Sequence, residues 1–283
     1  MGDVRIDLHA HTTASDGTTS PTELVSQAHD AGLDVVAITD HDTAVGWDEA
    51  VDAARLQGVG LVRGMEMSTR YHGMSVHLLA YLHDRDNPAL VAELARTREQ
   101  RAARVRAMVD KLARDYPLTW DDVVAQADGA TAVLGRPHIA DALVAAGIVP
   151  DRSAAFEHLV STSGPYYVRY HPTPTDQAVA LVRAAGGVPV LAHPGAESRG
   201  QILPDDAIAT LVDIGLAGVE AHHRDHSPVQ VARLVALASR WDLLVTGASD
   251  FHGTGKPNRL GENLTTGDVL DAIAAQGVTC VVM

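Results

Sequence analysis

Histidine and carboxylate side chains recur just after short apolar segments of this 283-residue chain, which contains 15 histidines. His9 and His11 are two residues apart, as are Asp250 and His252. In an extended segment, residues i and i+2 face the same side, so each pair can present two donor atoms to one pocket. Further residues of these types in similar positions are Asp40, His41, Asp42, Glu66, His77 and His193. Imidazole nitrogens and carboxylate oxygens suit Zn²⁺, Mn²⁺ and Fe²⁺, whereas Ca²⁺ prefers oxygen ligands alone.

The number of donors indicates more than one metal ion. A single ion takes about four to six ligands, and this set is larger, so we expect a cluster of two or three divalent ions, of Mn, Zn or Fe. Any one residue has a simpler explanation, because a single histidine in a half-buried strand, such as His77, is usually a hydrogen-bonded core residue. Histidine, aspartate or glutamate residues at six separate strand ends are much harder to explain as independent hydrogen-bonded core residues.

Alternating strands and helices are expected to bring these residues together. Short apolar segments rich in Val, Ile and Leu alternate with amphipathic segments of helical period, which is typical of βα units. The predicted strands cover residues 4–8, 34–38, 60–64, 75–81, 187–192, 217–221, 243–247 and 278–282, and the predicted helices cover residues 21–31, 47–57, 174–185, 205–213, 228–240 and 266–275. In a parallel α/β barrel, the loops at the carboxyl ends of the strands share one rim, so ligands far apart in sequence become neighbours there.

A helical segment interrupts this alternation. Residues 88–114 predict one long arginine-rich helix, and further helices are expected at residues 119–127, 137–146 and 152–161, with no strand before residues 166–170. We therefore predict a barrel made of residues 1–86 and 166–283, with residues 87–165 inserted as a helical cap domain. The long helix is expected to expose a solvated charged face that includes Arg96, Arg98, Arg101, Arg104 and Arg106.

Composition limits the classes of partner. Hydrophobic residues make up 46% of the chain and charged residues 20%, which predicts a globular protein with a sizeable core. The formal charge of −14 opposes binding to a long nucleic-acid duplex or an anionic membrane, so a phosphate substrate would need a local positive site. The single cysteine, Cys280, excludes an intramolecular disulfide and is expected to lie in the core. No apolar segment approaches the roughly 20 residues that span a bilayer and no signal peptide is evident, so we expect a cytoplasmic protein.

The order of the motifs resembles that of a known family. The chain contains DLHAHT at 7–12, SDG at 15–17, ITDHD at 38–42, GME at 64–66, His77, AHP at 192–194 and SDFH at 249–252. This series is similar to the motif set of the PHP (polymerase and histidinol phosphatase) domain family, and it involves both ends of the chain. The resemblance implies a distorted (β/α)7 barrel of the α/β class, with a trinuclear metal centre on its carboxyl-terminal rim.

The resemblance also implies how the ligands divide among the ions. The first ion would be held by His9, His11, Glu66 and Asp250, the second by Asp16, His41 and His252, and the third by Glu66, His77 and His193. Glu66 would therefore bridge two ions. Three divalent ions facing three carboxylates would leave a net positive centre that favours a phosphate dianion.

Two further segments resemble the branch of this family that acts on nucleoside 3′,5′-bisphosphates, related nucleotides or short RNA 5′ ends. The first, GRPHIA at 135–140, places Arg136 and His138 at a predicted helix N-terminus, where they can face an anion. Alternatively, Arg136 is a surface residue in front of an ordinary helix start. The second segment, EAHHRDHS at 220–227, implies His223 and His226 as neighbours of the active site, and His222 stands where the family usually has an aromatic residue.

The reaction expected from these features is hydrolysis of a phosphomonoester of a small nucleotide, or of a short RNA or DNA end, by metal-activated water. Arg136, His138 and the third ion would hold the phosphate, and His223 or His226 would protonate the leaving oxygen. Three alternatives are a phosphatase of the histidinol-phosphate type, a metal-dependent amidohydrolase and a module kept only for structure. An arginine–histidine pair suits phosphate better than a neutral amide, and a structural module would lack ligands that this chain retains.

Overall fold

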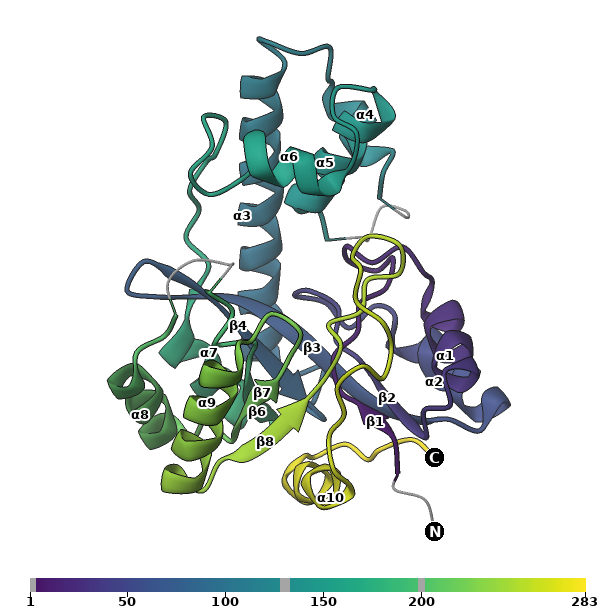
Figure 1. The fold of residues 1–283 in the computed structure, drawn as a ribbon, viewed down its shortest axis with the longest axis vertical. Coiled ribbons are helices and arrows are strands. Elements are labelled where there is room, and N and C mark those ends of the chain that lie inside the picture. The colour runs from purple at the N-terminus through teal and green to yellow at the C-terminus, as the bar shows by residue number, and fades with distance from the viewer. Residues whose placement is uncertain (1–3, 128–132, 198–201) are drawn as a thin grey trace.

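A curved sheet lies at the base of the molecule, with helices around it and a second group of helices above it (Figure 1). The structure is a computed structural model, and it describes residues 4–127, 133–197 and 202–283. The two groups of helices have separate apolar cores. The sheet positions the predicted ligands, and the upper helices cover one end of it.

The sheet has eight strands and mixed directions. The strands β1 (Ile6–Asp7), β2 (Val35–Ile38), β3 (Gly60–Tyr71), β4 (Met74–Tyr81), β6 (Val188–Ala192), β7 (Gly218–His222) and β8 (Leu244–Gly247) are hydrogen-bonded in that order, and β5 (Thr173–Pro174) pairs with β3. β4 runs antiparallel to both β3 and β6, and the other pairs are parallel. The hairpin of β3 and β4 is thus the main departure from regular βα alternation.

The segment after β8 returns to β1 and nearly closes the sheet into a barrel. The amide of His11 donates to the carbonyl of Phe251 over 2.8 Å. The buried carboxylate of Asp7 accepts hydrogen bonds from the amides of Ser249 (3.0 Å) and Gly261 (2.8 Å). These contacts place the motif after β1 beside the motif after β8. The predicted distorted α/β barrel is confirmed.

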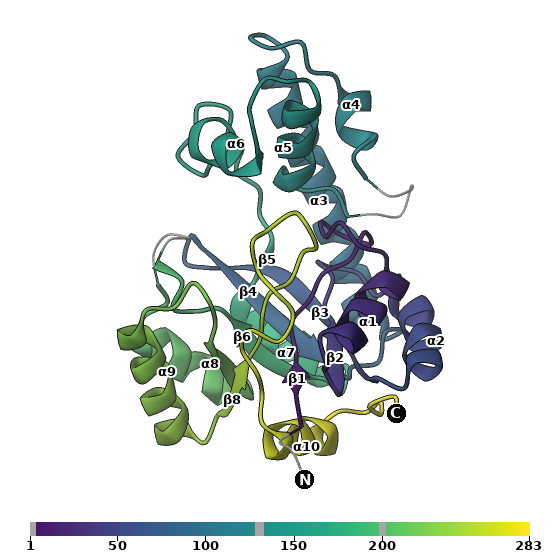
Figure 2. The ribbon, with the colours of Figure 1, turned by 45° about the vertical axis from the view of Figure 1, so that its right-hand side comes forward.

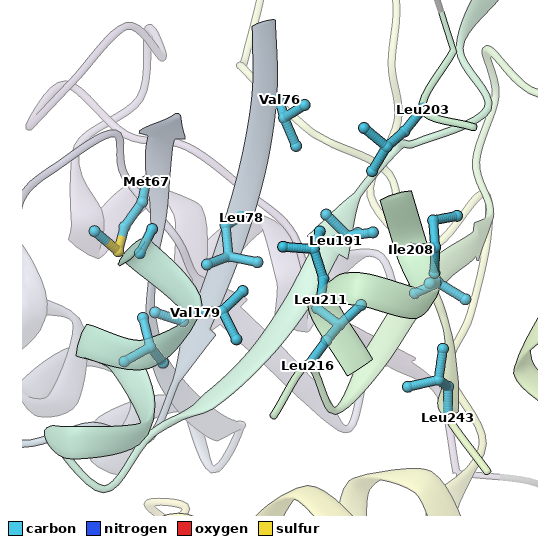
Figure 3. Close-up of a cluster of buried hydrophobic side chains, with 14 of the residues drawn as sticks. Met67, Val76, Leu78, Val179, Leu191, Leu203, Ile208, Leu211, Leu216 and Leu243 are labelled. Atoms are coloured by element: carbon cyan, nitrogen blue, oxygen red, sulfur yellow. The ribbon is translucent and has the colours of Figure 1, made fainter. Parts of the chain in front are cut away.

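Helices pack against the outside of the barrel (Figure 2). They are α1 (Pro21–Asp30), α2 (Trp47–Gln57), α7 (Thr175–Ala184), α8 (Asp205–Ile214), α9 (Pro228–Trp241) and α10 (Gly267–Gln276). α1 begins where the sequence predicts, because the Ser20 hydroxyl accepts from the amide of Glu23 and the Glu23 carboxylate accepts from the amide of Ser20. Met67, Leu78 and Leu211 belong to a buried aliphatic cluster that joins the strands to these helices (Figure 3).

The upper group consists of α3 (Pro88–Leu112), α4 (Trp120–Val124), α5 (Arg136–Ala145) and α6 (Arg152–His158). A buried cluster that includes Val105, Met108 and Ile139 holds these helices together. The amide of Val133 donates to the carbonyl of Ala14 over 3.2 Å, so the upper group also contacts the loop after β1. No helix in the described part of the chain, α3 included, has the length and apolar character needed to cross a membrane.

The predicted strand at residues 278–282 is wrong. This segment forms one bridge, between Val282 and Leu61, and Cys280 is exposed where a core position was expected. The reason is the offset between β3 and its neighbour, since β4 pairs with β3 only from Gly64 onward. The C-terminal segment therefore covers the free edge at the start of β3 without adding a strand.

The prediction of a solvated arginine face on α3 is wrong for two residues. Arg101 and Arg104 are only 5% and 7% exposed. Arg101 packs on the rim of the barrel, and Arg104 packs on Tyr170. Tyr170 belongs to residues 166–170, which run beside α3 and do not form the predicted strand. The alternation of charges along a helix does not reveal which distant segment will cover it.

Candidate metal centre

The nine predicted ligands come together on one rim of the barrel. His9 and His11 follow β1, Asp16 lies farther along the same loop, His41 follows β2, His193 follows β6, and Asp250 and His252 follow β8. Glu66 and His77 lie within β3 and β4. They reach the same rim because β4 is antiparallel to β3, which brings the start of β4 beside the later part of β3.

Three of the six non-glycine residues with positive φ angles in the described part of the chain lie at this rim. Asp42, His193 and Asp250 have φ angles of 52°, 34° and 54°, in the left-handed region that residues other than glycine rarely adopt. Such strain clusters at functional sites, where the surrounding structure maintains it. Here it occurs where each chain segment leaves its strand and turns over the barrel.

Four buried side chains point their donor atoms at one another. The Nε2 atom of His9 lies 3.1 Å from Nε2 of His11, 3.3 Å from Oε2 of Glu66 and 3.5 Å from Oδ1 of Asp250. The Nε2 atom of His11 lies 3.0 Å from the same Glu66 oxygen and 3.4 Å from the same Asp250 oxygen. Metal–ligand bonds of about 2.1 Å give donor–donor distances of roughly 3.4 Å in a tetrahedral site. These four atoms can therefore share one ion.

The two oxygens of Glu66 face different groups of histidines. Its Oε2 faces His9 and His11, whereas its Oε1 lies 2.7 Å from Nδ1 of His77 and 3.1 Å from Nε2 of His193. A single carboxylate thus stands between two sets of nitrogen donors. This is the arrangement that a bridging ligand needs.

Asp16 lies among three histidines. Its Oδ1 is 3.4 Å from Nε2 of His252 and 3.6 Å from Nδ1 of His11, and its Oδ2 is 3.8 Å from Nε2 of His41. Asp16, His41 and His252 are the residues predicted to hold the second ion. Because His11 contacts both Asp16 and the first group, the two groups form one continuous cluster.

Burial and neighbouring charges shift the pKa values of the cluster in both directions. Burial opposes a charge on His9 and His11, but the surrounding carboxylates raise the pKa of His9 well above its usual value and that of His11 to about 9. Burial lowers the pKa of His252 to about 4. Burial also opposes ionisation of Asp16 and Glu66, yet the neighbouring imidazoles hold the pKa of both well below the ordinary range.

The donor set fits divalent transition metals. Buried ionised carboxylates attract positive charge, and the imidazoles supply nitrogen lone pairs beside them. Six imidazoles and three carboxylates are more donors than one ion can use, because an ion of this type takes about four to six ligands. The cluster can therefore hold more than one metal ion.

Glu220 supports two of these residues, and sequence reasoning missed it. It is fully buried on β7, its Oε1 lies 3.0 Å from Nδ1 of His9, and its Oε2 accepts from the amide of His193 over 2.8 Å. A carboxylate on the far nitrogen of a metal-binding histidine fixes the orientation and tautomer of the ring. The signal in the sequence is one glutamate inside an otherwise apolar strand segment.

Asp40 and Asp42 lie beside the predicted metal ligands, but their carboxylates form hydrogen bonds that fix neighbouring segments of the chain. Asp40 accepts hydrogen bonds from the amide of Thr12 (2.8 Å) and the hydroxyl of Ser15 (2.6 Å), which fixes the loop after β1. Asp42 accepts from Nη1 of Arg101 over 3.0 Å. Both carboxylates are therefore engaged in supporting contacts.

Arg136 and His138 begin α5 as predicted, but they contact different partners. His138 is buried, and its Nδ1 accepts from the amide of Gly135 over 3.1 Å, so it caps its own helix. Arg136 is half-buried, donates to the carbonyl of Val160 over 3.2 Å and lies 5.9 Å from the ring centroid of Tyr167. This geometry does not support the prediction that both side chains grip one phosphate.

His223 and His226 have different surroundings. The Nε2 atom of His223 is buried, has no hydrogen-bond partner among the described residues and lies 3.6 Å from Oδ2 of Asp250. In His226, Nδ1 lies 2.8 Å from a backbone carbonyl and Nε2 accepts from the amide of Gly195 over 3.1 Å. His223 therefore borders the cluster, whereas His226 has no free nitrogen for the predicted proton transfer.

A cleft of about 890 Å³ lies between the upper helices and the barrel. Its lining includes Ser15, His138, Arg152 and Lys256. The Nζ atom of Lys256 donates to Oδ2 of Asp250 over 2.9 Å, so the cleft borders the metal centre. Its size suits a small nucleotide, since pockets for small molecules occupy about 300–1,000 Å³.

Comparison with known proteins identifies the family. The model of the PHP domain matches residues 7–130. A 5′-3′ exoribonuclease of Haemophilus influenzae is 33% identical over 95% of this chain and 96% of its own length. A 3′,5′-nucleoside bisphosphate phosphatase of Chromobacterium violaceum is 32% identical over 90% of this chain and 89% of its own. A crystal structure from Bifidobacterium adolescentis, assigned as a metal-dependent phosphoesterase, has a TM-score of 0.95 at 46% identity and covers 96% of both chains. The chain belongs to the PHP domain family.

Proposed function

We propose that the chain is a metal-dependent phosphatase that acts on a small nucleotide, either a nucleoside 3′,5′-bisphosphate or the phosphorylated end of a short oligonucleotide. The observation that carries this proposal is the position of Glu66 between two groups of histidines, near a cleft of nucleotide size. The relatives named as an exoribonuclease and as a nucleoside bisphosphate phosphatase support the same class of substrate.

Two or three divalent ions, of Mn, Zn or Fe, are the cofactors in this proposal. His9, His11, Glu66 and Asp250 would hold the first, Asp16, His41 and His252 the second, and Glu66, His77 and His193 the third. When bound, such ions activate water and neutralise the charge of a phosphate ester. The chain itself keeps these donors buried, and Glu220 holds the ring of His9 in place.

His223 is the residue that contacts the leaving oxygen in this proposal, as a hydrogen-bond donor. Its Nδ1 accepts a hydrogen bond from the amide of Asp225 over 3.0 Å, which places the proton of the neutral ring on Nε2. That Nε2 atom is buried at the edge of the cluster and makes no hydrogen bond to a described residue. The Nε2–H group can donate a hydrogen bond to the leaving oxygen of the substrate and stabilise its negative charge, and water then supplies the proton. His226, bonded to the backbone through both nitrogens, positions the loop.

Residues 87–165 are the cap domain in this proposal, and residues 1–86 and 166–283 form the barrel. The Nη1 atom of Arg152, on the cap, lies 3.5 Å from the backbone carbonyl of Asp16. The cap thereby forms one wall of the cleft beside the metal centre. A substrate in this cleft would contact both parts of the chain.

Release of phosphate tests the proposal. Protein loaded with Mn²⁺ is given adenosine 3′,5′-bisphosphate, a 5′-phosphorylated RNA dinucleotide, histidinol phosphate and an N-acetyl amino acid. We expect phosphate from the first two, loss of that activity in Glu66→Gln, and normal activity in Glu99→Gln, since Glu99 is exposed on α3. Activity on histidinol phosphate alone, or on the amide alone, would overturn the proposal. Less than one metal ion per chain in chelator-free protein would favour a purely structural module.

A further inference from the structure

Lys256 lines the cleft and contacts one of the predicted metal ligands. It lies on the loop after β8, and its side chain is half-buried. Its Nζ atom donates to Oδ2 of Asp250 over 2.9 Å. An ammonium group has three N–H donors, and within the part of the chain that the structure describes this is the one hydrogen bond of the Lys256 side chain. The other two donors can therefore serve a molecule in the cleft.

The two oxygens of Asp250 face different partners. Its Oδ1 lies 3.5 Å from Nε2 of His9 and 3.4 Å from Nε2 of His11, within the group predicted to hold the first ion. Its Oδ2 faces Nζ of Lys256 and also lies 3.6 Å from Nε2 of His223. Lys256 therefore approaches the same oxygen as His223, the residue assigned to the leaving oxygen. The ammonium group lies beside the position where the reacting phosphate would meet the first group of ligands.

Asp250 stands between two positive sites. Its single negative charge faces Lys256 through Oδ2, and its Oδ1 belongs to the group for the first ion. One carboxylate cannot neutralise both, so the ammonium group keeps an excess of positive charge toward the cleft. A phosphate oxygen supplies negative charge there, and a lysine suits it as a compact point charge with rotatable donors.

The backbone on both sides of Lys256 is fixed by side-chain hydrogen bonds. The amide of Thr254 donates to Oγ1 of Thr18 over 2.8 Å. The Nδ2 atom of Asn258, which is buried, donates to the carbonyl of Ser249 over 2.6 Å. A side chain whose backbone is already held loses less freedom when it binds a ligand. Lys256 is thus positioned before a substrate arrives.

The cap covers the segment that carries Lys256. Gly255 precedes it, and a Cβ atom at this position would collide with Nη1 of Arg152 on α6. Arg152 also lines the cleft, but it pairs with Asp141 of α5. The charge of Arg152 therefore acts within the cap, whereas the charge of Lys256 acts at the metal rim.

We propose that Lys256 binds a nonbridging oxygen of the phosphate group that is hydrolysed, while its hydrogen bond to Asp250 holds the ammonium group in place. This inference rests on the proposed function. A charge-assisted hydrogen bond at this oxygen stabilises the negative charge of the phosphate during the reaction. Every ester substrate contains this phosphate. Lys256 should therefore matter equally for substrates with one phosphate and with two.

The first test measures kcat and KM with adenosine 3′,5′-bisphosphate and with p-nitrophenyl phosphate, which has a single phosphate. We expect Lys256→Gln to lower kcat/KM about 10- to 100-fold on both substrates, and Lys256→Arg, which keeps the charge, to lower it less. Arg259→Gln is the matched control, because it removes the same charge from the same loop at a side chain that is 83% exposed, and it should retain activity. A loss confined to the bisphosphate would overturn the assignment to the reacting phosphate.

The second test measures binding without turnover. Titration calorimetry with inorganic phosphate is carried out on protein at saturating Mn²⁺, and competition with a chromophoric chelator gives the metal affinity. We expect Lys256→Gln to bind phosphate about tenfold more weakly than the wild type and Arg259→Gln. Its metal affinity should be unchanged or higher, because removal of a neighbouring positive charge favours bound cations.

Three results would overturn the role of Lys256. They are normal phosphate binding by Lys256→Gln, a metal affinity of this variant well below that of the wild type, which would make Lys256 only a support for Asp250, and absence of phosphate binding in the wild type. Absence of phosphate release from every ester by the wild type would instead refute the proposed function, and the calorimetry would still decide whether Lys256 binds phosphate. Thermal unfolding identifies any variant that fails to fold, and Lys256→Met then replaces Lys256→Gln.

Discussion

The Nδ1 atom of His9 lies 3.0 Å from Oε1 of Glu220, and both side chains are fully buried. The opposite nitrogen of the same ring faces Glu66 and Asp250. Glu220 therefore determines which nitrogen of His9 points into the cluster, without itself contacting the other donors of the first group. It acts as a positioning residue for the metal centre.

Substitution of Glu220 by glutamine should weaken metal binding. The amide is nearly the same size but cannot supply the negative charge that holds the proton on Nδ1 of His9, so metal affinity should fall about 10- to 100-fold. Competition with a chromophoric chelator measures this affinity directly. Glu99→Gln, at an exposed position of α3, should retain wild-type affinity. Equal affinities for the two variants would contradict the positioning role.

Substitution of His77 should remove one ion and leave the others. His77 contacts Oε1 of Glu66, whereas the first group uses Oε2, so His77→Asn should lower the metal content by about one ion per chain. Elemental analysis after dialysis gives the stoichiometry. His72→Asn is the control, because His72 is exposed in the neighbouring turn. Unchanged content, or loss of all metal, would show that the ligands are not divided in this way.

The metal cluster could be predicted because its signal is local. The i, i+2 spacing placed His9 with His11, and the alternation of strands and helices placed both beside Asp250 and His252, whose ring lies 4.0 Å from that of His11. The other predicted ligands also follow a strand or stand within one, except Asp16, which lies farther along the loop after β1 and was predicted only from the family resemblance. Because the carboxyl ends of the strands share one rim of the barrel, residues that are far apart in the sequence lie close together there.

The hairpin of β3 and β4 and the buried arginines could not be predicted in the same way. The hairpin depends on the two residues His72 and Gly73, with φ angles of 43° and 92°, and a histidine is a weak signal for such a turn compared with asparagine. The burial of Arg101 and Arg104 depends on Asp42 and Tyr170, which are about 60 residues away in sequence. Contacts of that kind arise from packing and leave no pattern along α3.

The pair of Arg101 and Asp42 should contribute strongly to stability as long as both members are present. Their charges are buried and 3.0 Å apart, so Arg101→Met would leave the carboxylate of Asp42 without its cation and lower the free energy of unfolding by about 3–5 kcal/mol. Denaturant unfolding measures the loss. Adding Asp42→Asn to Arg101→Met should recover part of it, because the unpaired charge is then removed. A double variant no more stable than Arg101→Met would rule out a charge-pair origin.

His83 should make the protein less stable in acid. Its ring is buried, 4.9 Å from that of Trp47, and burial lowers its pKa from 6.5 to about 4. The unfolded chain therefore takes up the proton more readily than the folded chain, so stability falls as the pH drops from 6.5 to 4 and the loss is complete below that range. The difference corresponds to about 3 kcal/mol.

The comparison that isolates this effect is between the wild type and His83→Gln at each pH. Burial raises the pKa of Asp7 to about 6, which gives a contribution of opposite sign between pH 6 and 4. That contribution is common to both proteins, so it cancels in the difference of their unfolding free energies. The wild type should lose stability relative to His83→Gln as the pH falls from 6.5 to 4. If the difference in unfolding free energy between the two proteins stays constant across this range, His83 does not remain neutral in the folded protein. Its ring would then carry a positive charge while buried beside Trp47.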